Sequence, residues 1–529
     1  MPTTDASASW RARLGSDTLR SIPLPLLLLG GVILARLALA GWWLWVDDGV
    51  VDTESGRHLQ RSWDAYLAMD GGDMLTLLDR PTEYPPLLHF VGDVGAAIGG
   101  LDVESFIGAQ DLVFIPALAI GCYGAGTIAY GRTAGLLAAV FALGAPMVVS
   151  VFHMFLIDTS QMAMAAVTIW AILASDRFSR TGVASLAGLA AGLGMLSKQN
   201  FPVFVAGLMA VVMVRGGWRH WRGLLAFALV AALVSATWYW SEIDRTLDLI
   251  RGSSSAVPAT EAAAASNPGR WTSKSFGYYV WSTLNLSLML PLTLMAVGGA
   301  ISLSVRWLRR RGRDDVTPEL VVGGLFSYFA LVWIALKDPR YALPALPYMA
   351  VLGTGWIPLL RERWRVVAIA ALGAVALMNV VGTVADSGAP VRISFPGAPK
   401  SGLGERELTL YAPGGWIAGK PETEGAALEV LRGAAADPNI DAVAFDPGAN
   451  QSDFNHPGLD ILSRVAGIPI AIPFDPEDRR QVMLINRTPA PGNPPPCAVT
   501  GRGSQIYLAR GSPEVPFEQR EIFCPMARR

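Results

Sequence analysis

Carboxylate-bearing side chains gather in polar stretches that interrupt an otherwise apolar sequence. The connection formed by residues 47–85 is rich in acids and contains Asp52 and Glu54. A second polar stretch, VFHMFLIDTSQM, contains Asp158. A carboxylate beside a substrate hydroxyl can remove its proton as a general base. Asp52, Glu54 and Asp158 are therefore the candidate catalytic residues.

Two later stretches supply cations. Lys198 lies in GMLSKQNFPVFV, and Arg340 lies in LKDPRYALPALP, where Asp338 is a candidate local partner. Lysine and arginine both bind phosphate, and positive charge stabilises a departing phosphate. The side chains predicted to bind substrate are His58, Glu83, Tyr84, His153, Lys198, Arg340 and Tyr341. Together with the acids, they could transfer a sugar from a polyprenyl phosphate to an acceptor.

Each of these residues also has a plainer interpretation. Acids in an exposed loop are commonly just solvated, and Asp158 needs no function if it lies at the membrane interface. Lys198 could lay its stem along apolar surface and keep its amine in water. The functional hypothesis is favoured because four separate stretches supply matching chemistry.

The elements that must position these side chains are membrane helices. Of the 529 residues, 52% are hydrophobic and only 16% are charged, which is typical of a membrane protein. The net charge of −1 gives no support to a nucleic-acid partner. Apolar segments occur at residues 22–46, 111–129, 134–151, 160–174, 182–196, 200–214, 223–240, 282–304, 319–336, 341–360 and 366–384. A further run, residues 86–100, is either a short span or a segment that enters without crossing.

Basic clusters in the connections predict the orientation, because they favour the cytoplasmic side. The arginines before the first helix place the N-terminus in the cytoplasm of an inner (plasma) membrane protein. An odd number of crossings, between 11 and 13, then puts all four polar stretches and the tail outside. Residues 54–69 are predicted to form an amphipathic helix along the interface, with Leu59, Trp63, Tyr66 and Leu67 on one face.

The polar tail, residues 385–529, is predicted to be a separate extracytoplasmic α/β domain after a membrane domain of residues 1–384. Short β-type runs, ELTLYA, DAVAFD, IPIAIPF, QVMLIN and SQIYLA, accompany helical segments at 423–436 and 457–465. A disulfide between Cys497 and Cys524 is plausible in an oxidising compartment, and two unpaired thiols are an equal alternative.

At these residues the chain resembles the GT-C superfamily of glycosyltransferases that use lipid-linked sugars. Within it, the resemblance is to the branch of protein O-mannosyltransferases and aminoarabinose transferases (glycosyltransferase family 39-like). The stretches that carry it, in the family's order, are DTESGRH (52–58), TEYPPLLH (82–89), YGRTAGLLAAVFALGAP (130–146), HMFLID (153–158), LSKQ (196–199) and PRYALPALP (339–347).

The resemblance implies an all-α polytopic fold of 11–13 transmembrane helices with its active site at the outer face. It also implies a single inverting displacement, with Asp52 or Glu54 as general base and Asp158 as a second acid. Lys198 and Arg340 would contact the phosphate of a polyprenyl-phosphate-linked sugar, and the acceptor would be a glycan, lipid or protein. A divalent metal is possible, held by the three acids.

Two departures from the family pattern leave questions open. The family's adjacent Asp-Glu pair is spaced here as Asp52-Thr-Glu54, so either acid could be catalytic, and Tyr84 stands where the aminoarabinose branch has a lysine. The main alternative is a transporter or flippase of a lipid-linked substrate, although no internal repeat is present. A membrane scaffold whose outer domain binds a partner is the third hypothesis.

Overall fold

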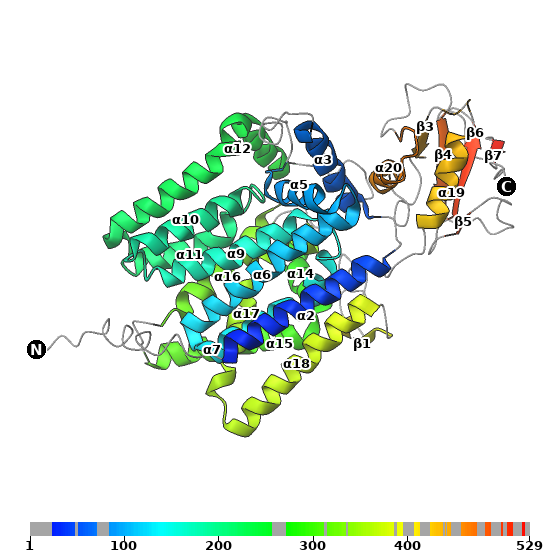
Figure 1. Ribbon diagram of the computed structural model, residues 1–529. Helices are drawn as coiled ribbons and strands as arrows, with labels where there is room; N and C mark the ends of the chain where they lie inside the picture. Colours follow the sequence, from blue (N-terminus) through cyan, green and yellow to red (C-terminus); the bar gives the residue numbers. More distant parts are fainter. Residues whose placement is uncertain are drawn as a thin grey trace, which may run out of the picture.

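The computed structural model describes most of the chain as a bundle of helices with a smaller group of strands and helices at one end (Figure 1). The described residues are 24–47, 51–70, 84–255, 271–310, 315–334, 337–385, 389–394, 407–412, 424–436, 438, 440, 442–445, 456–472, 482–487, 499–500, 505–510 and 521–523. Glu83, Cys497 and Cys524 lie outside them.

The bundle is built from apolar helices joined by short connections. Its helices are α2 (Leu24–Val46), α5 (Leu87–Gly99), α6 (Val103–Tyr130), α7 (Arg132–Leu143), α8 (Pro146–Val151), α9 (Ile157–Ala174), α10 (Thr181–Met195), α11 (Val203–Val214), α12 (Trp221–Ser255), α14 (Ser273–Ser282), α15 (Met289–Arg310), α16 (Thr317–Trp333), α17 (Leu346–Gly355) and α18 (Glu362–Ala385). Short helical turns are η1 (Gly217–His220), η2 (Thr283–Ser287), η3 (Pro339–Ala345) and η4 (Ile357–Leu359). Every one of the eleven predicted apolar segments contains one of these helices.

Length and hydropathy mark much of the bundle as membrane-spanning. Among the described residues, seven helical segments are long and apolar enough to cross a bilayer, and five further apolar helices have 10–17 residues. The run at residues 86–100 forms α5, whose 13 residues are fewer than the roughly 20 that cross a bilayer comfortably. The predicted multi-pass helical membrane fold is confirmed.

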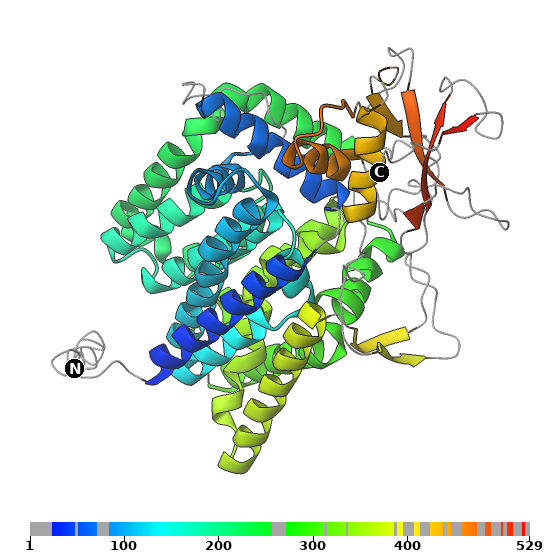
Figure 2. The same cartoon turned by 45° about the vertical axis from the view of Figure 1, so that its right-hand side comes forward.

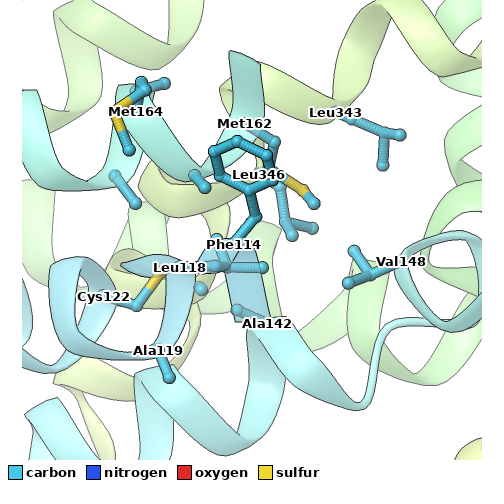
Figure 3. Packing of buried hydrophobic residues seen from close by; sticks show 14 of the residues in the cluster. Phe114, Leu118, Ala119, Cys122, Ala142, Val148, Met162, Met164, Leu343 and Leu346 are labelled. Carbon is cyan, nitrogen blue, oxygen red and sulfur yellow. The ribbon is translucent and has the colours of Figure 1, made fainter. Parts of the chain in front are cut away.

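Small residues let the central helices approach closely. A Cβ added at Gly121 of α6 would lie 2.6 Å from the backbone of Ala166 in α9, and one at Gly126 would lie 2.8 Å from Gly135 of α7. Buried side chains of several helices meet around this crossing (Figure 3). They include Phe114, Leu118, Cys122, Ala142, Met162, Met164, Leu343 and Leu346. Tight packing here fixes α9, which carries Asp158, against α6.

An amphipathic helix, α3 (Thr53–Asp70), follows α2. Leu59 and Trp63 are buried, Tyr66 is partly buried, and Leu67 is 49% exposed. The predicted helix therefore exists, and its apolar face packs on the bundle.

The described part of the tail contains two sheets and two helices (Figures 1 and 2). Strands β1 (Val391–Ser394) and β2 (Glu407–Tyr411) form an antiparallel pair. The second sheet has the order β3-β4-β6-β5, with β7 also on β6, and its strands are β3 (Ala442–Phe445), β4 (Val482–Arg487), β5 (Val499–Thr500), β6 (Gln505–Arg510) and β7 (Glu521–Phe523). The helices are α19 (Glu424–Ala435) and α20 (His456–Val465).

Most of the predicted tail elements are present. Four of the five β-type runs form strands, and both helical segments form helices. The run IPIAIPF was wrongly predicted as a strand, because its described part makes only an isolated bridge from Ala471 to Ala442. The tail also contacts the bundle directly, since Asn285 Oδ1 accepts hydrogen bonds from the backbone N–H and the hydroxyl of Thr409 in β2.

Candidate active site

Asp52 lies immediately before helix α3. Its Oδ1 accepts hydrogen bonds from the backbone N–H groups of Glu54 (2.9 Å) and Ser55 (3.3 Å), as an N-cap residue does. Its Oδ2 is buried and has no hydrogen-bond partner among the described residues. Burial raises the pKa of Asp52 to about 6, although the two N–H donors and the Arg340 guanidinium favour the charged form. Asp52 thus presents one oxygen with a raised affinity for a proton.

Glu54 has different surroundings. Its carboxylate lies 3.3 Å from Arg57 Nη1, and its side chain is 38% exposed. Glu54 is thus already paired, whereas Asp52 keeps one inaccessible oxygen without a partner among the described residues. The geometry therefore distinguishes between two acids that the sequence left equal.

Asp158 and Lys198 form a buried ion pair. Lys198 Nζ lies 3.0 Å from Asp158 Oδ1, and both side chains are almost fully buried. The same ammonium lies 4.4 Å from the centre of the Tyr341 ring. Burial opposes the charge on Lys198, but the Asp158 carboxylate outweighs it, and the pKa of Lys198 is raised. Lys198 is thereby held as a fixed cation.

The two carboxylate oxygens of Asp338 orient the Arg340 guanidinium. Its Nε and Nη2 donate to Asp338 Oδ1 (3.0 Å) and Oδ2 (2.7 Å), and Asp338 also caps the turn η3 by accepting from the Arg340 backbone N–H. The predicted local pair is confirmed. The Arg340 charge also lowers the pKa of Asp52, so the two groups interact electrostatically.

A hydrogen-bond network joins the acid-bearing segments. Ser55 Oγ accepts from the backbone N–H of Phe155 at 2.9 Å, so α3 is tied to the connection that leads into α9. Gln110 of α6 donates to Met154 O (2.9 Å) and accepts from Leu156 N (3.0 Å) and Thr159 Oγ1 (3.1 Å). Residues separated by about a hundred positions in sequence are thus held together next to Asp158.

Histidine and tyrosine side chains line the other side of α3. His58 Nδ1 lies 3.3 Å from His89 Nε2, and the His58 ring lies 5.4 Å from the Tyr84 ring, over which the Arg61 guanidinium sits. Burial, and then the neighbouring His89 and Arg61 side chains, hold the pKa of His58 well below its usual range. The neutral His58 ring and the Tyr84 hydroxyl could therefore both hydrogen-bond a substrate.

His153 packs against an aromatic side chain of the bundle. Its ring stacks on Trp43 of α2, with the centroids 4.1 Å apart and the planes 8° from parallel. This contact accounts for the position of the ring as part of the α2 packing. Glu83 lies outside the described residues, so its predicted role stays a prediction.

Three contacting residues were missed at the sequence level. His89 stands inside the quoted TEYPPLLH stretch, and Arg61 lies one turn after His58, but neither was selected. Gln110 carried the clearest signal, because an amide at the edge of a long apolar run must find hydrogen-bond partners when it is buried.

The three acids do not form a common metal site. Among the described residues, no group of three or more histidine, cysteine, aspartate or glutamate side chains is arranged to hold a metal ion. Asp158 is engaged with Lys198, and Glu54 with Arg57. The predicted possibility of a metal held by Asp52, Glu54 and Asp158 gains no support from this arrangement.

Comparison with known proteins adds three findings. Residues 83–240 match the family model described as dolichyl-phosphate-mannose-protein mannosyltransferase. The fold is similar to that of ArnT from Cupriavidus metallidurans bound to undecaprenyl phosphate, with a TM-score of 0.55 and 14% identity over 86% of this chain and 93% of that one. The apo form of the same enzyme gives a TM-score of 0.53 and 15% identity, over 86% of this chain and 92% of that one. No curated protein sequence matches the chain significantly.

These findings bear on the predicted resemblance. The family model covers the segment from the YPPLLH stretch to the middle of α12, and the structural likeness covers most of both chains. The predicted resemblance to the GT-C glycosyltransferases and the predicted enzyme class, a membrane glycosyltransferase of lipid-linked sugars, are confirmed.

Proposed function

We propose that this protein transfers a sugar from a polyprenyl-phosphate donor to an acceptor hydroxyl at the extracytoplasmic face, with inversion at the anomeric carbon. Asp52 acts as the general base, and Lys198 and Arg340 bind the donor phosphate. The observation that carries the proposal is the Asp52 carboxylate, whose inaccessible Oδ2 has no hydrogen-bond partner among the described residues. Two cations oriented by carboxylates support it, Arg340 by Asp338 and Lys198 by Asp158.

The chemistry divides between these groups. Asp52 Oδ2 takes the proton from the acceptor hydroxyl as its oxygen attacks the anomeric carbon, and the bond from that carbon to the phosphate oxygen breaks. Negative charge grows on the departing phosphate, where Lys198 and Arg340 stabilise it. Both cations are already oriented by carboxylates, so little reorganisation is needed as the charge develops.

The remaining predicted residues have supporting roles in this proposal. Asp158 keeps Lys198 charged and in place rather than acting as a second base, since their ion pair occupies its Oδ1. Tyr341 packs beneath the Lys198 ammonium. His58 and Tyr84 would contact sugar hydroxyls.

A polyprenyl phosphate is the donor carrier that best fits. The solved ArnT is bound to undecaprenyl phosphate, and its fold is shared over 86% of this chain. Basic connections predict that the described acids, the cations and the tail lie outside the cytoplasm. The tail from residue 385 onward is then an extracytoplasmic domain beside the site.

The direct test is turnover of radiolabelled polyprenyl-phosphate sugars by the purified protein. Sugar transfer or donor hydrolysis is expected for the wild type and should fall by about 10²–10⁴ in Asp52→Asn, the range expected on loss of a general base. Glu54→Gln is the matched control, because that acid is exposed and paired. If donors bind but are never consumed while lipid crosses liposomes, the alternative of a flippase is correct.

A further inference from the structure

A tail helix packs on the helix that Asp52 caps. Along α3, Gly56, Gln60 and Asp64 are spaced by four residues and so lie on one stripe. Along α20, Pro457, Asp460 and Arg464 form a matching stripe at spacings of three and four. Figure 2 shows α20 beside α3 at the end of the bundle.

The contacts along these stripes are specific. Gln60 Nε2 donates to Asp460 Oδ2 at 2.7 Å, and Arg464 bridges Asp64 Oδ1 (2.7 Å) and Asp460 Oδ2 (2.8 Å). Arg464 thus links two acids, one on each helix. The hydrogen bond between Gln60 and Asp460 is partly buried, so water competes with it less than at a fully exposed surface.

Gly56 brings the backbones together. A Cβ built at this position would lie 2.8 Å from the backbone carbon and the Cβ of Pro457, closer than real Cβ atoms approach. Any residue larger than glycine must therefore push α20 away from α3. Asp52 lies four residues before this contact, and its backbone carbonyl accepts from the Gly56 N–H at 2.8 Å.

A neighbouring face of α3, about 100° around the helix, is buried against the bundle. Ser55, Leu59 and Trp63 are nearly inaccessible, and Ser55 is bonded to Phe155. The helix is therefore held between the bundle and α20. Because the N-cap carboxylate moves with the first turn of α3, contacts on either face determine where Asp52 Oδ2 lies.

We propose that α20 positions the general base, with Asp460 and Arg464 as positioning residues that act on Asp52 through α3. This inference rests on the proposed function. The tail is then a part of the catalytic unit: it fixes the base against the donor-phosphate cations, without touching the reacting atoms. Displacements near 1 Å can lower turnover by about 10²-fold, so a modest shift of α3 has a measurable effect.

The first test compares two glycine-to-alanine variants of the full-length protein. Gly56→Ala should lower kcat about tenfold or more and change the donor KM little, because it shifts the base and leaves the phosphate cations in place. Gly425→Ala in α19 is the control, since an added Cβ there meets nothing within 4 Å. Both changes add one methyl group to a glycine in the first turn of a helix, and only Gly56 has Pro457 within reach of that group.

The second test removes the polar contacts. Gln60→Ala combined with Arg464→Ala should lower kcat and move the acidic limb of the pH–rate profile from about 6 toward the usual carboxylate range, as Asp52 becomes better hydrated. Arg464→Lys should restore part of the activity. Arg432→Ala, an exposed arginine at the end of α19, should behave as wild type.

Amide hydrogen exchange of α3 reports how firmly α20 holds the helix, and it can be measured without any enzymatic turnover. The variants should exchange the first turns of α3 faster than the wild type does. Unchanged exchange, kcat and pH profile in folded variants would overturn the positioning role. A wild type that consumes no donor would overturn the proposed function instead, and the exchange result would still decide the α20 contact.

Discussion

Asp52 is partly buried and Asp158 is buried, and their partners give the two carboxylates different properties. Asp52 has a pKa raised to about 6 and an oxygen without a described partner, whereas Asp158 is tied to Lys198. A base must be deprotonated to act, so kcat/KM should fall tenfold per pH unit below about 6 and level off above it. A pH–rate profile with a donor phosphodiester, which does not titrate there, measures this. A flat profile down to pH 4 would contradict the assignment.

The buried ion pair makes a second prediction about single residues. Asp158→Asn leaves the Lys198 ammonium buried without its counter-charge, which should destabilise the protein by about 3–5 kcal/mol, and Lys198→Met should do the same to the carboxylate. The loss of unfolding free energy in the double variant should be smaller than the sum of the two single losses, because the double variant buries no unpaired charge. Thermal unfolding in detergent of the wild type, the two single variants and the double variant measures this double-mutant cycle. Strict additivity would mean that the two residues are not coupled as described.

At the residue scale the sequence identified most of the candidate site. Lys198, Arg340 and the acids were selected because charged groups are costly near a membrane and therefore informative. The choice between Asp52 and Glu54 was not readable, since it depends on burial and on the Arg57 partner. His89 was missed because a single histidine on an apolar helix carries no sign of the His58 ring that it meets in space.

Among the elements, the connection before α9 depends most on side-chain hydrogen bonds. Gln110 satisfies one backbone carbonyl and one backbone N–H in this buried segment. Gln110→Met keeps the volume but leaves both groups unsatisfied, at a cost of about 1–3 kcal/mol each. We expect a lower unfolding temperature and a turnover reduced about tenfold, because Asp158 and Lys198 then shift. Thr168→Val, a buried change elsewhere on α9, is the control, and equal losses in both variants would argue against a role for the connection.

The helices were predictable, and their mutual contacts were not. Apolar length and turn residues predict where helices and strands lie, and these properties are local. The docking of α20 on α3 joins residues 400 positions apart through a glycine and a few polar side chains. No periodic pattern in the sequence predicts such a contact. The run IPIAIPF fails for a related reason, because a strand needs a neighbouring strand along its length and the described part of this segment, residues 468–472, forms a bridge only at Ala471.

For the whole molecule, the proposal requires the candidate site and the tail to face the same side of the membrane. Arg219 lies in an exposed turn of a basic connection, and Ser394 ends the exposed strand β1 of the tail. In a background without the three native cysteines, Ser394→Cys should react with a membrane-impermeant maleimide on intact cells. Arg219→Cys should react only after the membrane is opened, because basic connections face the cytoplasm. The reverse labelling pattern would place Asp52 and its cations on the cytoplasmic side. In that case an acceptor at the outer face could not reach the base, and the acceptor would have to be a cytoplasmic one.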